Sequence, residues 1–435
     1  MITYITLAIF GFSFLLIIFE VFDKALIALS GAILMVMFRI LTPEEAISSV
    51  DFETIILLMS MMLLVNVSSK SNIFTWINTK IAFLTKGNPL AMFVLFSTIT
   101  TVFSAFLDNV TTVLLIVPLT IQLIKGMGRD PKPYIFAEII FSNVGGALTL
   151  IGDPPNIIIG GAANLSFISF IANLWVPILM SSLFIMIIFL ISNWQKLKPI
   201  TSNLQELYIA NILIEKIKIT FLKKTLHTDF IVKAISIILL TIAGFLLEDF
   251  IHLPLFVIAI TGAITLMLVT SKRENIHDAF KSVEWTTLFF FGGLFIMVAG
   301  VEKTGILSQL SNWIANSSTD LLYLSLLILW VSGFVSMILD NIPFVTIMIP
   351  VVLGITEKFS TQPDINVLWW ALSLGACLGG NATSIGASAN IVSIDLARKE
   401  NVNISFLEYM KFSLPLTIGV LIICSIYLYF RIRII

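Results

Sequence analysis

The sequence carries little charge. Only 12% of its 435 residues are Asp, Glu, Lys or Arg, whereas a soluble protein carries roughly 25%. Hydrophobic residues make up 58% of the chain, and its mean hydropathy is +1.03. These values predict an integral membrane protein and argue against a large soluble core. The net charge of −1 gives no basic surface that would indicate a nucleic-acid partner.

Cysteine, histidine and the common catalytic motifs are also scarce. The two cysteines, Cys377 and Cys424, lie in apolar segments and predict neither a disulfide framework nor a metal site. The three histidines fall in predicted loops. No HExxH, GxSxG or P-loop pattern is present, which argues against a membrane enzyme and an intrinsic ATPase, although an external ATPase partner stays open. We expect no metal and no cofactor, apart from a coupling H⁺ or Na⁺.

What the chain does contain is an internal duplication. Three segments of the first half recur in the second half at offsets of 232 to 234 positions. The matching segments are VDFETIILL from Val50 and VEWTTLFFF from Val283, Asp108-Asn109 and Asp340-Asn341, and GGALTLIGDPPNII from Gly145 and GGNATSIGASANIV from Gly379. Two halves that each hold a carboxylate and a helix-breaking stretch are typical of secondary transporters.

Apolar runs of about 20 residues are long enough to cross a bilayer core of ~30 Å. Five such spans are predicted in each half, and the fourth span of each half is broken. They lie near 3–21, 25–41, 53–68, 133–164 and 169–193, and near 230–247, 253–271, 285–301, 366–397 and 411–431. The first run lacks a cationic region and a small-residue cleavage site, so we expect it to be retained as a span.

Each half also holds one extra apolar stretch, 89–124 or 321–356, with its Asp-Asn pair near the middle. A straight helix would expose that carboxylate to lipid at mid-membrane, which is costly. A re-entrant hairpin instead buries the pair at its tip, where irregular backbone is tolerated. Segments 69–86 and 304–319 precede the hairpins and are predicted to be interfacial amphipathic helices.

The predicted fold is an all-α polytopic membrane protein of two inverted repeats, each with five transmembrane helices, one re-entrant hairpin and a helix broken at mid-membrane. The first repeat spans 1–194, a cytoplasmic linker spans 195–228 and the second repeat spans 229–435. With this topology, 20 of the 25 Lys and Arg residues fall on the side of the linker, as the positive-inside rule requires. We therefore expect both termini outside a cell (inner) membrane, the first hairpin open to the cytoplasm and the second open to the exterior.

The hairpin tips offer ligands for a cation. A turn leaves backbone carbonyls free, and the following helix presents its positive N-terminal end. Carboxylate and carbonyl oxygens suit a hard cation. The alternative is that each aspartate only caps the helix after it. The candidate residues are Asp108, Asn109, Thr111 and Thr112 in the first tip, and Asp340 and Asn341 in the second.

The glycine-rich stretches cannot be continuous helices. In the first half Pro154-Pro155 removes two backbone donors, and in the second half glycines and small polar residues take their place. The amides and hydroxyls beside the breaks could coordinate substrate, whereas close helix packing through small residues is the alternative. The candidates are Asn143, Thr149, Asp153 and Asn156, and Asn381, Thr383, Ser384, Ser388 and Asn390.

The two halves differ in their buried carboxylates. Asp153 aligns with Ala387, and Glu138 aligns with Leu372. Because a carboxyl group in an apolar site can carry a proton, these residues suit H⁺ or Na⁺ better than a bare anion. No Lys or Arg is predicted near mid-membrane, so we do not expect a fixed positive charge at the site. The coupling candidates are Asp108, Asp153, Asp340 and Glu138.

These stretches resemble a known family. The segments DNVTTVLLIVPLTIQL, AEIIFSNVGGALTLIGDPPNIII, DNIPFVTIMIPVV and GACLGGNATSIGASANIVS are similar to the melanosomal P protein and its bacterial relatives. That group belongs with arsenite permeases, sodium/proton antiporters and citrate or dicarboxylate carriers in the ion transporter superfamily. The resemblance implies a homodimer of inverted repeats with a scaffold part and a moving transport part. Dicarboxylate carriers use Ser-Asn-Thr at the tips, whereas this chain has Asp-Asn-Val and Asp-Asn-Ile.

The leading hypothesis is a secondary active transporter in the lipid bilayer. It would move a small inorganic ion or anion, coupled to H⁺ or Na⁺, by an alternating-access, elevator-like mechanism. An ion channel on the same scaffold and a citrate or dicarboxylate carrier are the alternatives. Arsenite, chloride, Na⁺ and carboxylates all remain open as substrates.

Overall fold

The computed structural model of the chain describes residues 2–19, 22–73, 76–77, 80, 84–85, 88–198, 228–272, 275–360 and 362–434. Every regular element in these ranges is a helix, and eight of the helices are long and apolar enough to cross a membrane. The prediction of an all-α polytopic membrane protein is confirmed. Most of the predicted linker 195–228, and residues 74–75, 78–79, 81–83 and 86 of the predicted interfacial segment 69–86, lie outside the described residues.

One group of helices, which we name the frame, contains the first three predicted spans of each half. Within it α2 packs against α17, and α4 packs against α15. The frame consists of α1 (Ile2–Ile18), α2 (Lys24–Met37), α4 (Phe52–Ser69), α13 (Thr228–Leu246), α15 (Leu255–Thr270) and α17 (Trp285–Glu302). Short helices connect them, namely α3 (Pro43–Ser48), α14 (Glu248–Ile251) and α16 (Ile276–Lys281).

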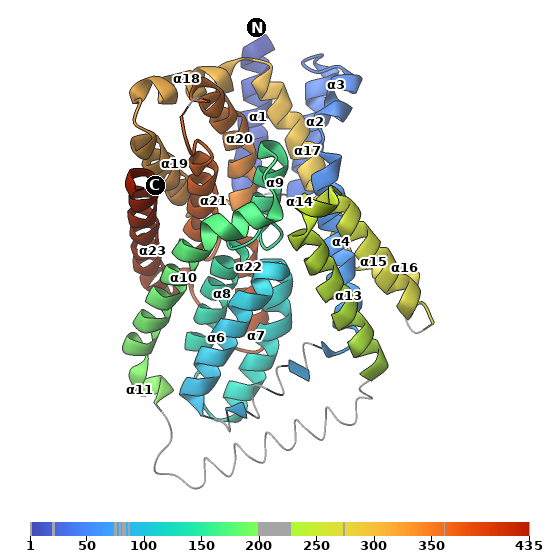
Figure 1. Ribbon diagram of the computed structural model, residues 1–435, viewed down its shortest axis with the longest axis vertical. Helices are drawn as coiled ribbons and strands as arrows, with labels where there is room; N and C mark the ends of the chain where they lie inside the picture. Colours follow the sequence, from blue (N-terminus) through green and yellow to red (C-terminus); the bar gives the residue numbers. More distant parts are fainter. Residues whose placement is uncertain are drawn as a thin grey trace.

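A second group, the hairpin assembly, contains both hairpins and both broken helices. The hairpins are α6 (Pro89–Phe106) with α7 (Asn109–Gly126), and α19 (Leu321–Ser336) with α20 (Asn341–Lys358). The broken helices are α8 (Lys132–Gly146) with α9 (Pro154–Ala163), and α21 (Val367–Gly379) and the 3₁₀ turn η1 (Gly380–Ala382) with α22 (Ser388–Lys399). In Figure 1, α6 and α7 lie in the lower half of the molecule and α19 and α20 in the upper half.

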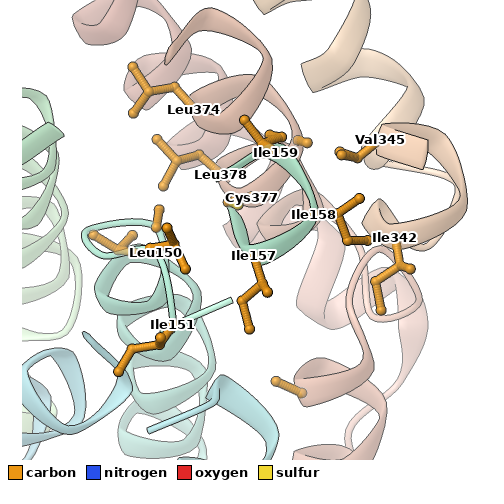
Figure 2. Packing of buried hydrophobic residues seen from close by; sticks show 14 of the residues in the cluster. Leu150, Ile151, Ile157, Ile158, Ile159, Ile342, Val345, Leu374, Cys377 and Leu378 are labelled. Carbon is orange, nitrogen blue, oxygen red and sulfur yellow. The ribbon is translucent and has the colours of Figure 1, made fainter. Parts of the chain in front are cut away.

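Each hairpin packs on the broken helix of the other half. Helix α7 contacts α22, and α20 contacts α9. Figure 2 shows the second contact, where Ile158 of α9 lies beside Ile342 and Val345 of α20, while Leu374 of α21 lies on the other side of the view. This exchange joins the four elements into one body whose interior is shared by both halves of the chain.

The remaining helices flank the two groups. The long helices α10 (Phe167–Ser192) and α23 (Phe406–Ile434) pack against each other and against α8 and α21, and the short α11 (Trp194–Leu197) follows α10. Helix α18 (Ile306–Ser317) packs on both α17 and α20, so it bridges the frame and the hairpin assembly. The helix predicted over 304–319 is therefore confirmed.

Close helix contacts explain part of the glycine content. A Cβ atom on Gly145 would lie 2.2 Å from the backbone oxygen of Thr101 in α6. A Cβ atom on Gly379, its counterpart, would lie 2.5 Å from the backbone oxygen of Gly333 in α19. Only glycine permits this approach, so each hairpin touches the broken helix of its own half backbone to backbone. The packing interpretation of these glycines is confirmed.

Candidate functional site

The first hairpin tip is held by an aspartate cap. Asp108 precedes α7, and its Oδ1 accepts a hydrogen bond from the backbone N–H of Thr111 at 2.7 Å. Its Oδ2 accepts a second hydrogen bond from the Thr111 hydroxyl at 2.5 Å. Both carboxylate oxygens therefore hold the first turn of α7. The capping interpretation is confirmed at this tip.

The second tip begins with the same two residues and makes no such cap. Asp340 precedes α20 but accepts no capping hydrogen bond from it. The third helical position, which supplies both donors in the first tip, is Pro343 here, and proline has neither a backbone N–H nor a hydroxyl. Instead Asp340 Oδ2 lies 3.1 Å from Lys24 Nζ and accepts a hydrogen bond from the Ser388 hydroxyl at 3.3 Å.

Asp153 lies between the two tips. It precedes α9 without capping it, and its side chain is 1% exposed. Its Oδ1 accepts a hydrogen bond from Asn109 Nδ2, and its Oδ2 accepts one from Asn341 Nδ2, both at 3.4 Å. One carboxylate thus receives an amide from each hairpin and makes no cap for the helix that follows it.

Two buried asparagines hold the helix breaks. Asn156 Nδ2 donates a hydrogen bond to the carbonyl of Thr149 at 2.9 Å. Its counterpart Asn390 donates to the carbonyls of Gly380 and Thr383 at 2.8 and 2.7 Å. These amides satisfy carbonyls that the interrupted helices leave free, so both residues shape the backbone around the site.

A chain of amides links the second break to Asp153. Asn143 Nδ2 donates to the side-chain oxygens of Asn381 and Asn390, both at 2.9 Å. Asn143 Oδ1 in turn accepts from Asn109 Nδ2 at 3.1 Å. Because Asn390 must point its nitrogen at backbone carbonyls, each later amide has only one satisfied orientation. Asn109 is therefore set with its nitrogen toward Asp153.

The two threonines beside the breaks serve the hairpins. The Thr149 hydroxyl donates to the carbonyl of Ala105 in α6. The Thr383 hydroxyl donates to the carbonyl of Met337, the residue after α19, at 2.6 Å. Both hydroxyls are thereby occupied in holding the last turn of a hairpin arm.

A small pocket of about 60 Å³ lies where the tips meet the frame. Ligand pockets for larger molecules usually span ~300–1,000 Å³, so this space suits a small ion with a few waters. Three carboxylates line it, together with one lysine and both tip amides. The polar lining residues are Lys24, Asp108, Asn109, Asp153, Glu284, Thr287, Asn341 and Ser388.

Residues of the frame were missed by the sequence interpretation. Lys24 is the first residue of α2, and Glu284 precedes α17. The Glu284 carboxylate accepts a hydrogen bond from the Thr287 hydroxyl at 3.1 Å. The expectation that no fixed positive charge would lie at the site is wrong, because Lys24 lines the pocket. Its position at a helix start gave no sign of this contact.

Five of the sixteen predicted residues line the pocket, namely Asp108, Asn109, Asp153, Asn341 and Ser388, and eleven do not. The Thr112 hydroxyl is buried without a hydrogen-bond partner in the described part of the chain. Ser384 is half-buried in the second break. Glu138 is buried in α8, where one carboxylate oxygen accepts from the Thr120 hydroxyl at 2.5 Å and the other, Oε2, has no partner among the described residues. The other eight residues outside the lining bond to lining residues or hold the tips and breaks, as described above.

Comparison with known proteins gives consistent relationships. Residues 14–375 match the sequence profile of a citrate transporter family. A 46 kDa membrane protein of Mycobacterium leprae is 34% identical, with 98% of each chain covered. The human P protein is 31% identical over 95% of this chain and 58% of its own length. The crystal structure of the Alcanivorax borkumensis YdaH transporter has the same fold, with a TM-score of 0.57 at 14% identity, covering 86% of this chain and 83% of that one.

Proposed function

The chain belongs to the citrate transporter family and is a multi-pass membrane transporter, and from this premise we propose that it is a secondary active transporter of a small ion. Transport is coupled to H⁺ or Na⁺ and occurs by alternating access. The observation that carries the proposal is the pocket at the two tips, where Asp153 receives Asn109 from one hairpin and Asn341 from the other.

The charge of the pocket favours a cation. Asp108, Asp153 and Glu284 line it, against the single cation Lys24. A bare anion would meet three negative groups in a site of low dielectric, where repulsion is strong. The bound cation is either the substrate or the ion whose gradient drives transport.

Carboxylate transport is a second candidate, because the matching family is described as citrate transporters. The pocket would admit a carboxylate only together with cations that offset its acidic lining. A channel is the third possibility, and it would require ion flux far above the turnover of a carrier.

The division into frame and hairpin assembly supports an elevator-like movement. The pocket lies at the interface of the two groups and near the N-terminal ends of α2 and α17. Movement of the assembly along these helices would carry the pocket toward their opposite ends, on the other side of the membrane. We further propose inverted repeats, a homodimer formed through the frame, and a cytoplasmic linker.

Flux measurements in proteoliposomes test the proposal. Purified protein is reconstituted with a pH-sensitive dye inside and is given inward gradients of Na⁺, citrate, arsenite or chloride, each at two pH values. We expect saturable flux of one ion that depends on a Na⁺ or H⁺ gradient. Flux that is unchanged by the Na⁺ gradient and by the H⁺ gradient would contradict coupled transport.

Topology is tested separately by cysteine labelling. Single cysteines placed in 200–225 should react only from the cytoplasmic side, and cysteines placed in 42–50 only from the outside. The native Cys377 and Cys424 are buried, so they add little background. Labelling of both regions from one side would reject the inverted arrangement.

A further inference from the structure

Lys24 joins the frame to the second hairpin tip. It begins α2, and its ammonium lies 3.1 Å from Asp340 Oδ2 and 5.3 Å from the centre of the Phe290 ring in α17. The ammonium therefore rests on a frame helix by a cation–π contact while it binds a carboxylate of the hairpin assembly. Among the ion pairs of the described residues, this pair alone links a frame helix to a hairpin tip.

The pair also separates two spaces. On one side lies the small acidic pocket, which Lys24, Asn341 and Ser388 line. On the other side lies a cavity of about 550 Å³ with largely apolar walls from α1 and the second break, which Lys24, Asp340 and Ser388 line. Because Lys24 and Ser388 line both spaces, the ion pair lies where the two adjoin.

Asp340 is suited to exchange one cation for another. It takes no part in capping α20, so its charge is not committed to the helix. Its Oδ2 binds Lys24 and Ser388, while its Oδ1 is buried without a hydrogen-bond partner in the described part of the chain. A lysine ammonium on a flexible four-carbon stem can leave such a carboxylate without a change in the backbone.

We propose that Na⁺ is the transported or coupling cation and that Lys24 is its tethered competitor for Asp340. In the absence of that cation its ammonium neutralises Asp340 and holds the second tip against the frame. A small cation that reaches Asp340, beside the Lys24 and Ser388 that line both spaces, takes over its carboxylate. Lys24 is then displaced, and the hairpin assembly is released from α2. This inference rests on the proposed cation-coupled function, and it names the residue that makes release depend on binding.

A purely structural ion pair is the competing explanation. Lys303 and Glu45 form such a pair, with the Lys303 ammonium 2.6 Å from a Glu45 oxygen, and both residues lie on the frame side. Exposed pairs of this kind contribute little to stability. Because Lys303 touches neither hairpin tip, it supplies a matched control for removal of a lysine.

The experiment measures Na⁺ binding to purified full-length protein without any flux. Melting temperatures are recorded across Na⁺ concentrations at constant ionic strength, with choline as the replacement ion. Lys24→Met should lower the Na⁺ concentration for half-maximal stabilisation by about fivefold or more, a coupling of ordinary size. Lys24→Arg, which keeps the charge, and Lys303→Met should stay within about twofold of the parent.

A second measurement follows the accessibility of the second break, which lies beside the second tip. Ile385 lines the larger cavity and is 45% exposed, so the maleimide labelling rate of Ile385→Cys reports on the second break. Na⁺ should change this rate in the parent background, and Lys24→Met should give the changed rate without Na⁺.

Any of three results would overturn the proposal. The Lys24→Met protein could match the parent in both measurements, or Lys303→Met could respond as strongly as Lys24→Met. The parent could also show no response to Na⁺ in either measurement. Coupled flux in proteoliposomes could persist in each of these cases. The failure of this inference is therefore distinct from failure of the proposed function.

Discussion

The two hairpin tips begin with the same residues and use them differently. Both carboxylate oxygens of Asp108 accept hydrogen bonds from Thr111 at the start of α7. The carboxylate of Asp340 accepts none from α20 and pairs with Lys24 of the frame instead. The third helical position decides this, since threonine offers two donors and proline offers none. A repeated motif can therefore recur in both copies while its charge caps a helix in one and pairs with a lysine of the frame in the other.

The asparagines of the two tips, in contrast, do the same work. Asn109 and Asn341 each donate an amide hydrogen bond to Asp153. Asp153 itself belongs to the first half only, because Ala387 stands at the matching position. The site is therefore asymmetric for two reasons. Asp153 has no carboxylate counterpart in the second half, and Asp340 does not cap its helix as Asp108 does.

The largest effect is expected from Asp153→Ala. This change removes the acceptor that the two tips share, and we expect flux in proteoliposomes to fall by about a hundredfold, as when ligands of an ion site are lost. Asp153→Asn retains an acceptor oxygen and controls for the buried amides left unpaired. Its flux should fall equally while its melting temperature stays nearer the parent. Wild-type flux in either variant would show that Asp153 does not take part in ion binding.

Asp340→Asn should have the next largest effect. The amide can still accept from Ser388, but the charge that faces Lys24 is gone. We expect about a tenfold loss of flux, in the range of ordinary coupling energies. Asp108→Asn is the matched control at the other tip. Equal losses of flux in the two variants would show that the charges of Asp340 and Asp108 contribute equally to transport.

Pro343→Thr should make the second tip resemble the first. Threonine restores a backbone N–H and a hydroxyl at the third helical position, so Asp340 gains the donors that Asp108 uses. A helix cap is worth about 1 kcal/mol, which should raise the melting temperature by about 1–2 °C. Flux should fall by about threefold as Asp340 turns from Lys24 toward α20. A lower melting temperature would contradict this account.

The smallest effect is expected from Asp108→Asn. Asparagine caps helices about as well as aspartate, so flux should remain within about threefold of the parent and the melting temperature should hardly change. Asp108→Ala removes the cap and should cost about 1 kcal/mol of stability. A large loss of flux in a well-folded Asp108→Asn protein would place this carboxylate among the cation ligands.

Much of the site could be predicted from the sequence because its signals are local. The duplicated Asp-Asn pairs mark the tips, and the Gly, Pro and Asn stretches mark the breaks. Pro343 was also a readable signal, since a proline at that position excludes the usual cap. Lys24 could not be found in this way, because it stands at the start of an ordinary apolar helix and belongs to none of the matched segments. Glu284 does belong to one, where it aligns with Asp51, but that segment reads as the start of an apolar span and gives no sign of a place beside the tips.

The sequence by itself determined the membrane location, the helices, the two breaks and the cap at the first tip, because these depend on hydrophobic length and on hydrogen bonds between neighbours such as Asp108 and Thr111. Only the tertiary structure decided which groups meet in the pocket. Lys24 and Asp340 are 316 positions apart, and Asp153 and Asn341 are 188 apart. The first contact joins the frame to the second tip, and the second follows from the packing of α20 on α9, neither of which a local pattern encodes.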